Sequence, residues 1–158
     1  MILLTVGSQM PFDRLVRAVD DWASIHQNVD ILAQIGETDY VPKAMRWVKV
    51  MAPEIYLEHV DACDFLVGHA GMGTVITAAE HGKPLLVVPR RGHLRETRND
   101  HQVATARWLA ERPGIRVAMS EDQLPDQLEA MLAGSVRGIA SNDATNQLIA
   151  AVRAFIET

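Results

Sequence analysis

The residues that follow one apolar segment have the types needed to bind a phosphate. His69 is followed by Gly71, Gly73 and Thr74. Glycines lack a Cβ, so the backbone can approach a ligand closely there. A helix that opens at Thr74 would turn its free N–H groups and its dipole toward an anion, with His69 as an extra donor. The sequence therefore predicts a diphosphate site, and the expected ligand is a nucleotide.

The glycine turn does not match the motifs of the common nucleotide-binding families. It lacks the third glycine of a dinucleotide fingerprint, and the first apolar segment ends in a single glycine, Gly7. The turn is not followed by a Walker lysine, which argues against a P-loop NTPase. The chain has no Gly-x-Ser-x-Gly elbow, and its histidines lack the spacing of a zinc pair. We therefore expect neither a metal nor a cofactor.

Polar side chains near the turn are candidates for binding the rest of a nucleotide sugar. Thr77 lies about one helical turn after the glycines, and Glu80 lies three residues further along the same face. Either side chain can reach a ribose diol, and a surface position for Glu80 is an equal alternative. At the start of a later helix, Asn99 is a candidate sugar-binding residue, and a role as the helix N-cap is the alternative. His101 or Gln102 is expected to hydrogen-bond a sugar.

Arginines follow another apolar segment. Residues 90–98 contain four arginines and one glutamate, in a chain whose formal net charge is −5. A local positive patch of this kind attracts phosphates, while a solvated loop is an equal alternative for an isolated stretch. Because this stretch follows a strand end, we expect Arg90, Arg91 or Arg95 to close over the diphosphate.

The pattern of apolar residues predicts the strands and helices that position these residues. Apolar runs that alternate with helical repeats are typical of a parallel sheet covered on both faces. Ligands bind such sheets at the carboxyl ends of the strands, and the unusual residues follow three such ends. The predicted strands are 1–6, 29–35, 47–50, 64–68, 85–88 and 115–119, and the predicted helices begin at residues 11, 53, 74, 100, 120 and 142.

Length and composition indicate one soluble α/β domain over residues 1–158. The chain has 48% hydrophobic and 22% charged residues, as ordinary globular domains do. Its acidic balance argues against nucleic-acid binding. The apolar runs are too short to span a bilayer, and the first residues lack a signal-peptide pattern. We therefore expect a cytoplasmic location.

Five short segments, taken in order, carry a resemblance to a known family. They are Thr5-Val6-Gly7-Ser8-Gln9, His69-Ala70-Gly71-Met72-Gly73-Thr74, Gly82-Lys83-Pro84, Val88-Pro89-Arg90 and Asn99-Asp100-His101-Gln102. This set resembles the glycosyltransferase family 28 C-terminal domain. It is most similar to the small donor-binding subunits of split, two-component glycosyltransferases of the dolichol pathway and of bacterial exopolysaccharide assembly. The resemblance runs from the first residue to about residue 109.

The resemblance implies a Rossmann-like domain with a parallel sheet of about six strands, which is half of a GT-B fold. It implies a UDP-sugar donor, with Gln102 as a sugar contact and the uracil near Met51 and Ala52. His69 becomes the candidate catalytic residue, because a donor there can stabilise charge on the leaving diphosphate. The residues implied to hold the diphosphate are Gly7, Ser8, His69, Ala70, Gly71, Gly73 and Thr74.

One position departs from the family pattern. Many relatives have a glutamate eight residues after the histidine, where it binds the ribose diol. In this chain that position is Thr77, and the nearest carboxylate is Glu80. The ribose contact is therefore an open question at this stage.

The resemblance also implies a reaction and a partner. The implied reaction is an inverting transfer of a hexose from a UDP-sugar to a lipid-linked saccharide in exopolysaccharide or capsule assembly. Full-length relatives carry an acceptor-binding domain for which this chain has no room. We therefore expect a membrane-anchored, acceptor-binding partner subunit that holds this chain at the inner face of the membrane. Without it, the chain is expected to self-associate through exposed apolar surface.

Two questions stay open from the sequence. The last predicted helix, 142–156, has an apolar side that either packs on the chain's own sheet or docks the partner. The function has two alternatives as well. One is a non-catalytic, nucleotide-sugar-binding regulatory subunit, and the other is a sugar-nucleotide epimerase.

Overall fold

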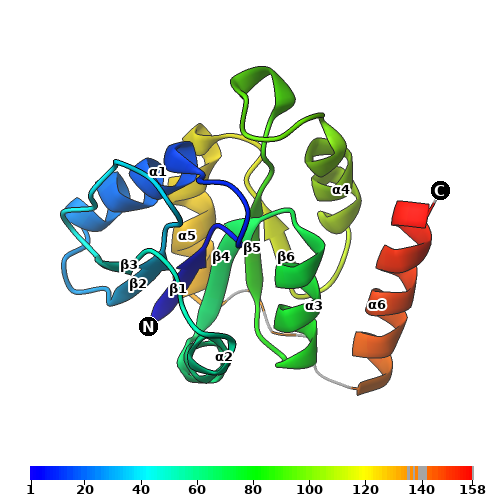
Figure 1. Cartoon of the computed structure of the whole chain (residues 1–158). Coiled ribbons are helices and arrows are strands. Elements are labelled where there is room, and N and C mark those ends of the chain that lie inside the picture. Colours follow the sequence, from blue (N-terminus) through cyan, green and yellow to red (C-terminus); the bar gives the residue numbers. More distant parts are fainter. Residues whose placement is uncertain (135, 137, 139–141, 158) are drawn as a thin grey trace.

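The computed structural model describes residues 1–134, 136, 138 and 142–157, and for 142–145 and 156 the backbone alone. In this part of the chain, six strands form one parallel sheet in the order β3-β2-β1-β4-β5-β6 (Figure 1). The strands are β1 (Ile2–Thr5), β2 (Ile31–Gln34), β3 (Arg46–Val48), β4 (Phe65–His69), β5 (Leu85–Val88) and β6 (Ile115–Val117). The helices are α1 (Asp13–Ser24), α2 (Pro53–Ala62), α3 (Met72–Glu80), α4 (His101–Leu109), α5 (Leu124–Leu132) and α6 (Asn142–Glu157).

The strand order places a ligand-binding crevice at the centre of the sheet. The chain builds outward from β1 to β3 on one side, then crosses to β4 and continues to β6. In open parallel sheets, ligands bind beyond the carboxyl ends of the strands where this order reverses. Here the reversal falls between β1 and β4, which pair in register from Ile2 with Phe65 to Thr5 with Gly68. The predicted α/β fold with a parallel sheet of about six strands is confirmed.

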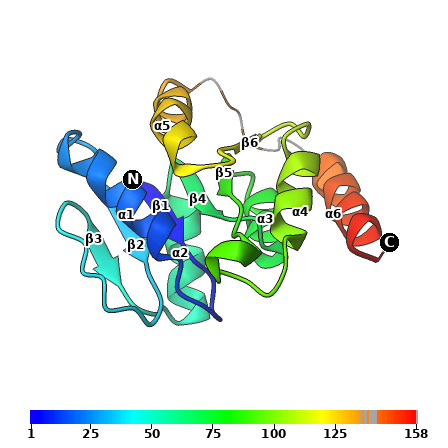
Figure 2. The same ribbon diagram turned by 90° about the horizontal axis from the view of Figure 1, so that it is seen from above.

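Helices cover both faces of the sheet (Figure 2), which explains the uninterrupted apolar runs of its strands. Successive strand residues point to opposite faces. Leu4 therefore packs with α1 and α5 in one core, and Leu3 packs with α2, α3 and α4 in the other. Both side chains are fully buried.

The last helix packs against the chain's own helices. α6 lies beside α3 at the outer edge of the domain (Figure 1). Leu148 and Val152 belong to the second core, and Phe155 stacks on Trp108 with 5.3 Å between the ring centroids. These apolar side chains are therefore engaged within the domain. None of the helices among the described residues combines the length and the apolar character needed to cross a bilayer.

Several element boundaries differ from the sequence prediction, by one to four residues. α3 begins at Met72 rather than at Thr74, because Gly71 is its N-cap. β3 ends at Val48, and Val50 is 71% exposed beyond it. As an edge strand, β3 pairs only with β2 within the described sheet, so its apolar run extends past the hydrogen-bonded residues. The connection between α5 and α6 lies partly outside the described residues.

Candidate functional site

A cavity of about 660 Å³ opens at the carboxyl ends of the central strands. Its lining comes from the loop after β1, the ends of β2 and β3, the start of α3 and the loop after β5. This is the position at which the reversed strand order predicts a ligand. The sequence-predicted residues that line it are Gly7, Ser8, Met51, His69, Gly71, Gly73, Thr74, Thr77, Arg90 and Gln102.

Several sequence-predicted residues do not line the cavity. Glu80 is the last residue of α3 and is exposed, about 12 Å along the helix axis from its start. It is therefore too far from the helix start to contact a nucleotide that binds there. Asn99 Oδ1 accepts from the His101 backbone N–H at 2.9 Å, but the N-cap of α4 is Asp100, so the predicted cap is wrong by one residue. The predicted residues outside the lining are Ala52, Ala70, Glu80, Arg91, Asn99 and His101.

The imidazole of His69 lies between two glycines. A Cβ at Gly71 would fall 2.0 Å from His69 Cε1, and a Cβ at Gly7 would fall 2.7 Å from His69 Nε2. These glycines therefore make room for the histidine ring, rather than only for a ligand as the sequence suggested. Gly73 differs, because a Cβ there would meet no atom of the described residues within 4 Å. The backbone at Gly73 is the part of the turn that stays open to a ligand.

His69 is neutral at physiological pH. Burial lowers the pKa of its imidazole to about 4, and the nearby Arg90 guanidinium acts in the same direction. Gln102 Nε2 lies 3.2 Å from His69 Nδ1. A neutral imidazole can donate one hydrogen bond and accept another.

Arg90 ties the walls of the cavity together and does not reach into it as a phosphate ligand. Its side chain is buried. Its two terminal nitrogens donate to the carbonyls of Val6, Met10, Pro11 and Glu96. Since each terminal nitrogen makes two such bonds, neither is available to close over a diphosphate. The prediction for Arg90 is corrected accordingly.

Arg91 is engaged away from the cavity as well. Its guanidinium donates to the Met119 carbonyl, and its backbone N–H donates to Glu96 Oε1 at 3.0 Å. Glu96 is also ion-paired with Arg14, which contacts Glu121 in turn. Arg90 and Arg91 therefore hold the loop after β5 in place, and the predicted patch does not present them to a ligand.

The sequence analysis missed a buried polar network that shapes the first glycine loop. Thr5 Oγ1 donates to Gln34 Oε1 at 2.8 Å. Gln34 Nε2 donates to the carbonyls of Gly7 and Lys49 at 3.2 and 3.0 Å. These bonds fix Gly7 at a φ of 81°, in the left-handed region that favours glycine. In the sequence, the only sign of this network is Gln34, a polar residue within the apolar segment that forms β2.

Tyr56 and Glu37 were also missed, although both line the cavity. Burial raises the pKa of Tyr56 to about 12, so its hydroxyl stays neutral. Tyr56 shares the lining with Met51, near the predicted uracil position. Within the described residues, no three His, Cys, Asp or Glu side chains are grouped so as to hold a metal ion.

Comparison with known proteins places the chain in a family. The model of the glycosyltransferase family 28 C-terminal domain matches residues 1–157. The chain belongs to this family, and the match extends well beyond residue 109, where the resemblance seen in the sequence ended.

Two curated relatives share part of the chain. A UDP-N-acetylglucosamine--N-acetylmuramyl-(pentapeptide) pyrophosphoryl-undecaprenol N-acetylglucosamine transferase from Granulibacter bethesdensis is 36% identical over 69 residues, which are 44% of this chain and 17% of that protein. The UDP-N-acetylglucosamine transferase subunit ALG13 of Mus musculus is 30% identical over 117 residues, which are 67% of this chain and 10% of that protein. The chain thus spans less than a fifth of the length of either relative.

Solved structures support the fold. The solution structure of ALG13 superimposes with a TM-score of 0.66 at 17% identity and covers 94% of each chain. MurG of Acinetobacter baumannii superimposes with a TM-score of 0.61 at 18% identity, over 96% of this chain and 49% of that one. The domain therefore has the fold of one half of a GT-B enzyme.

Proposed function

We propose that this chain binds the diphosphate of a UDP-sugar and acts as the donor-binding subunit of an inverting glycosyltransferase. The acceptor would be a lipid-linked saccharide of the kind used in exopolysaccharide or capsule assembly. A membrane-anchored partner would hold the acceptor and bring this chain to the cytoplasmic face of the membrane. Family membership and the two N-acetylglucosamine-transferring relatives support a transferase of this type.

One observation carries the proposal. The start of α3, His69 and the loop after β1 converge on a single cavity at the reversal of strand order. The first N–H groups of a helix have no partner within the helix, and its dipole favours negative charge at that end. The backbone at Gly73 has free space beside it, so a diphosphate can approach this end of α3 closely.

The chemistry follows from where charge develops. The acceptor hydroxyl attacks the anomeric carbon as the bond to the β-phosphate oxygen breaks, and UDP leaves with the bonding electron pair. The hydroxyl proton passes to a base, which we expect the partner to supply. Negative charge grows on the β-phosphate, where fixed N–H donors of α3 and the neutral His69 stabilise it without rearranging.

Exposed apolar residues at the cavity are consistent with a partner protein that covers this side of it. Met10 and Val50 line the cavity and are 41% and 71% exposed. An acceptor-binding partner that closes over this face would cover them and exclude water from the reaction. The isolated chain would expose them, which is the basis for expecting self-association.

Calorimetric titration tests the proposal directly. The protein, alone and with the candidate partner, is titrated with UDP, UMP and uridine. Saturable binding of UDP, tighter than that of UMP, is expected if the diphosphate carries the affinity. Glu80→Gln serves as a control, because Glu80 lies outside the cavity and its loss should leave UDP binding unchanged. Absence of saturable UDP binding in both preparations overturns the proposal.

Turnover separates the alternatives. Incubation with a UDP-sugar and no acceptor would give an epimerised sugar if the chain were an epimerase. Binding without transfer, even with partner and acceptor present, would identify a regulatory subunit. Transfer that requires both partner and acceptor supports the proposed enzyme.

A further inference from the structure

The amide of Gln102 connects the backbone of Arg90 to the ring of His69. The Arg90 N–H donates to Gln102 Oε1 at 3.1 Å, and Gln102 Nε2 lies 3.2 Å from His69 Nδ1. A backbone N–H can only donate, so its partner must be the amide oxygen. The NH₂ group of Gln102 must then face His69, and Nδ1 of the ring must accept.

This contact sets the position of the single proton of the neutral imidazole. A ring whose Nδ1 accepts carries its proton on Nε2. Nε2 lies on the side of the loop after β1, where a Cβ at Gly7 would be 2.7 Å away. The N–H of His69 is therefore directed toward the cavity end of that loop.

We propose that Gln102 is a positioning residue that holds His69 in the Nε2–H tautomer, so that the histidine presents a donor to an anion in the cavity. This inference rests on the proposed function, in which the anion is a diphosphate. It gives Gln102 a role besides the sugar contact that the family resemblance implies, and the amide keeps one N–H for such a contact.

The surroundings keep this arrangement fixed. The guanidinium of Arg90 is anchored on the carbonyls of Val6, Met10, Pro11 and Glu96, which immobilises the backbone that holds Gln102. Burial and the positive charge of Arg90 both disfavour a second proton on His69. Among the described residues, the other ionisable side chains of the cavity lining are Glu37, Tyr56 and Glu96.

Nitrogen-15 NMR of the ligand-free protein, labelled at histidine, tests the tautomer. The His69 signals are assigned by their loss in His69→Gln. At neutral pH we expect Nε2 to be protonated and Nδ1 unprotonated. Gln102→Glu replaces the donor with an acceptor and should place a proton on Nδ1. Gln102→Met removes the donor at similar length and should shift Nδ1 toward the value of a nitrogen without a hydrogen bond.

Gln127→Glu is the matched control. It makes the same change in charge on α5, outside the cavity lining, where the half-buried Gln127 accepts from Arg116 Nε at 2.6 Å. The His69 signals should not move in this variant. A protonated Nδ1 in the wild-type protein, or an unchanged Nδ1 in both Gln102 variants, overturns the proposal.

UDP affinity provides the functional readout, because UDP lacks the transferred hexose that Gln102 is implied to contact. Gln102→Met should weaken UDP binding by roughly tenfold or less, the value of one hydrogen bond. In a His69→Ala background the same substitution should have no further effect, since Gln102 acts through His69. Weaker binding of a UDP-sugar with unchanged binding of UDP would assign Gln102 to the sugar alone and overturn the proposal. If wild-type protein fails to bind UDP, the proposed function fails while the tautomer result stands by itself.

Discussion

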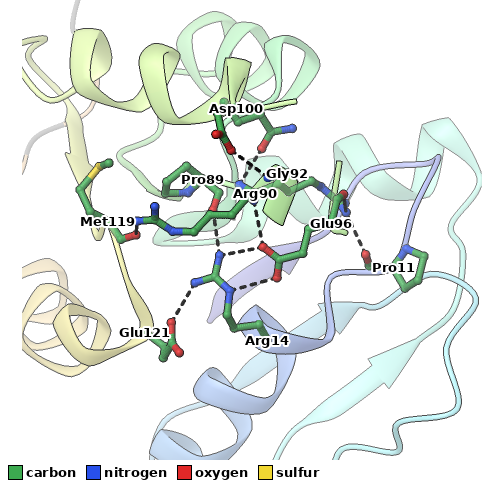
Figure 3. Close-up of polar contacts among 11 residues, drawn as sticks. Pro11, Arg14, Pro89, Arg90, Gly92, Glu96, Asp100, Met119 and Glu121 are labelled. Atoms are coloured by element: carbon green, nitrogen blue, oxygen red, sulfur yellow. Dashed lines mark hydrogen bonds and ion pairs between the residues drawn. The ribbon is translucent and has the colours of Figure 1, made fainter. Parts of the chain in front are cut away.

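Arg14 and Glu96 form a two-point ion pair that joins α1 to the loop after β5. Arg14 Nε donates to Glu96 Oε2 at 3.0 Å, and Arg14 Nη2 donates to Glu96 Oε1 at 2.9 Å (Figure 3). The two side chains are only 14% and 11% exposed. Arg14 also donates to the Pro89 carbonyl at 2.9 Å. This pair fixes the loop that supplies Glu96 and Thr97 to the cavity lining.

Glu96→Gln should therefore destabilise the domain. Removal of one partner leaves the Arg14 charge largely buried, and we expect the free energy of unfolding to fall by about 2 kcal/mol. Urea denaturation measures this change. Asp30→Asn is the control, because Arg46 and Asp30 also form a two-point pair but are 57% and 58% exposed. The loss at Asp30 should be well below about 1 kcal/mol, and equal losses at the two sites would contradict the prediction.

Stability should depend on pH through His69. Its pKa is about 4 in the folded protein against 6.5 in a model compound, so the unfolded chain binds the extra proton more readily. This contribution to stability is complete above pH 6.5 and is lost as the pH falls toward 4. Its full size is about 3 kcal/mol.

His69→Gln removes the titrating group and makes this pH dependence measurable. The free energy of unfolding of the variant should fall less steeply than that of the wild type between pH 6.5 and 4. Other histidines and carboxylates contribute equally to both proteins and cancel in the difference. Parallel curves for the two proteins would show that His69 titrates normally in the fold.

Two neighbouring glycines should respond differently to alanine. Gly73→Ala places a methyl group in open space within α3, so stability should be unchanged or raised by about 0.5 kcal/mol. UDP binding should still weaken, because the methyl group faces the proposed diphosphate seat. Unchanged UDP affinity in this variant would place the diphosphate elsewhere.

Gly71→Ala should damage both properties. The new Cβ would fall 2.0 Å from His69 Cε1, so the imidazole must move. We expect a loss of more than about 1 kcal/mol in the free energy of unfolding, as for other overpacked sites, together with weaker UDP binding. Thermal denaturation and calorimetry on the same preparation measure both. A stable variant that binds UDP normally would mean that the ring is not held where the structure has it.

Thr77→Glu should improve nucleotide binding. Thr77 lines the cavity, and a carboxylate at this position would reach the ribose diol of a bound nucleotide. A hydrogen bond to a charged group is worth enough to strengthen UDP binding roughly tenfold. Deoxy-UDP provides the control, since removal of a ribose hydroxyl should cancel most of the gain. A variant that binds UDP and deoxy-UDP with equal gain would rule out a ribose contact.

His69→Ala should slow sugar transfer in the assembled enzyme. Loss of one donor to the developing charge costs on the order of 10²–10³ in turnover at comparable sites. The release of UDP, measured with partner and acceptor present, reports the rate. Turnover equal to that of the wild type would remove His69 from the reaction.

Local patterns in the sequence were sufficient to predict most of the fold. The strands are apolar on both faces because helices cover both faces, and this gave continuous runs such as β1 and β5. Turn glycines marked the strand ends, and the crevice follows from the strand order. Errors arose at the edges, where β3 is partly exposed and the apolar residues beyond it, Val50 and Met51, line the cavity.

Contacts between distant segments were not predictable in this way. Arg90 looked like a phosphate ligand because its carbonyl partners Val6, Met10 and Pro11 lie about 80 residues earlier in the chain. Gly71 looked like a site of ligand approach because the position of the His69 ring depends on the fold. Glu80 looked like a ribose ligand from its helical face, although the length of α3 carries it away from the cavity.

The buried guanidinium of Arg90 has a consequence for how the cavity would receive the proposed nucleotide. It joins the loop after β1 to the loop after β5 through hydrogen bonds to backbone carbonyls. Neither loop can move away from the cavity unless several of these bonds break. The cavity is thus already formed without a ligand, and the protein would lose little conformational entropy when a ligand binds. If the proposed partner subunit completes the cavity, any closing motion must then come from that partner.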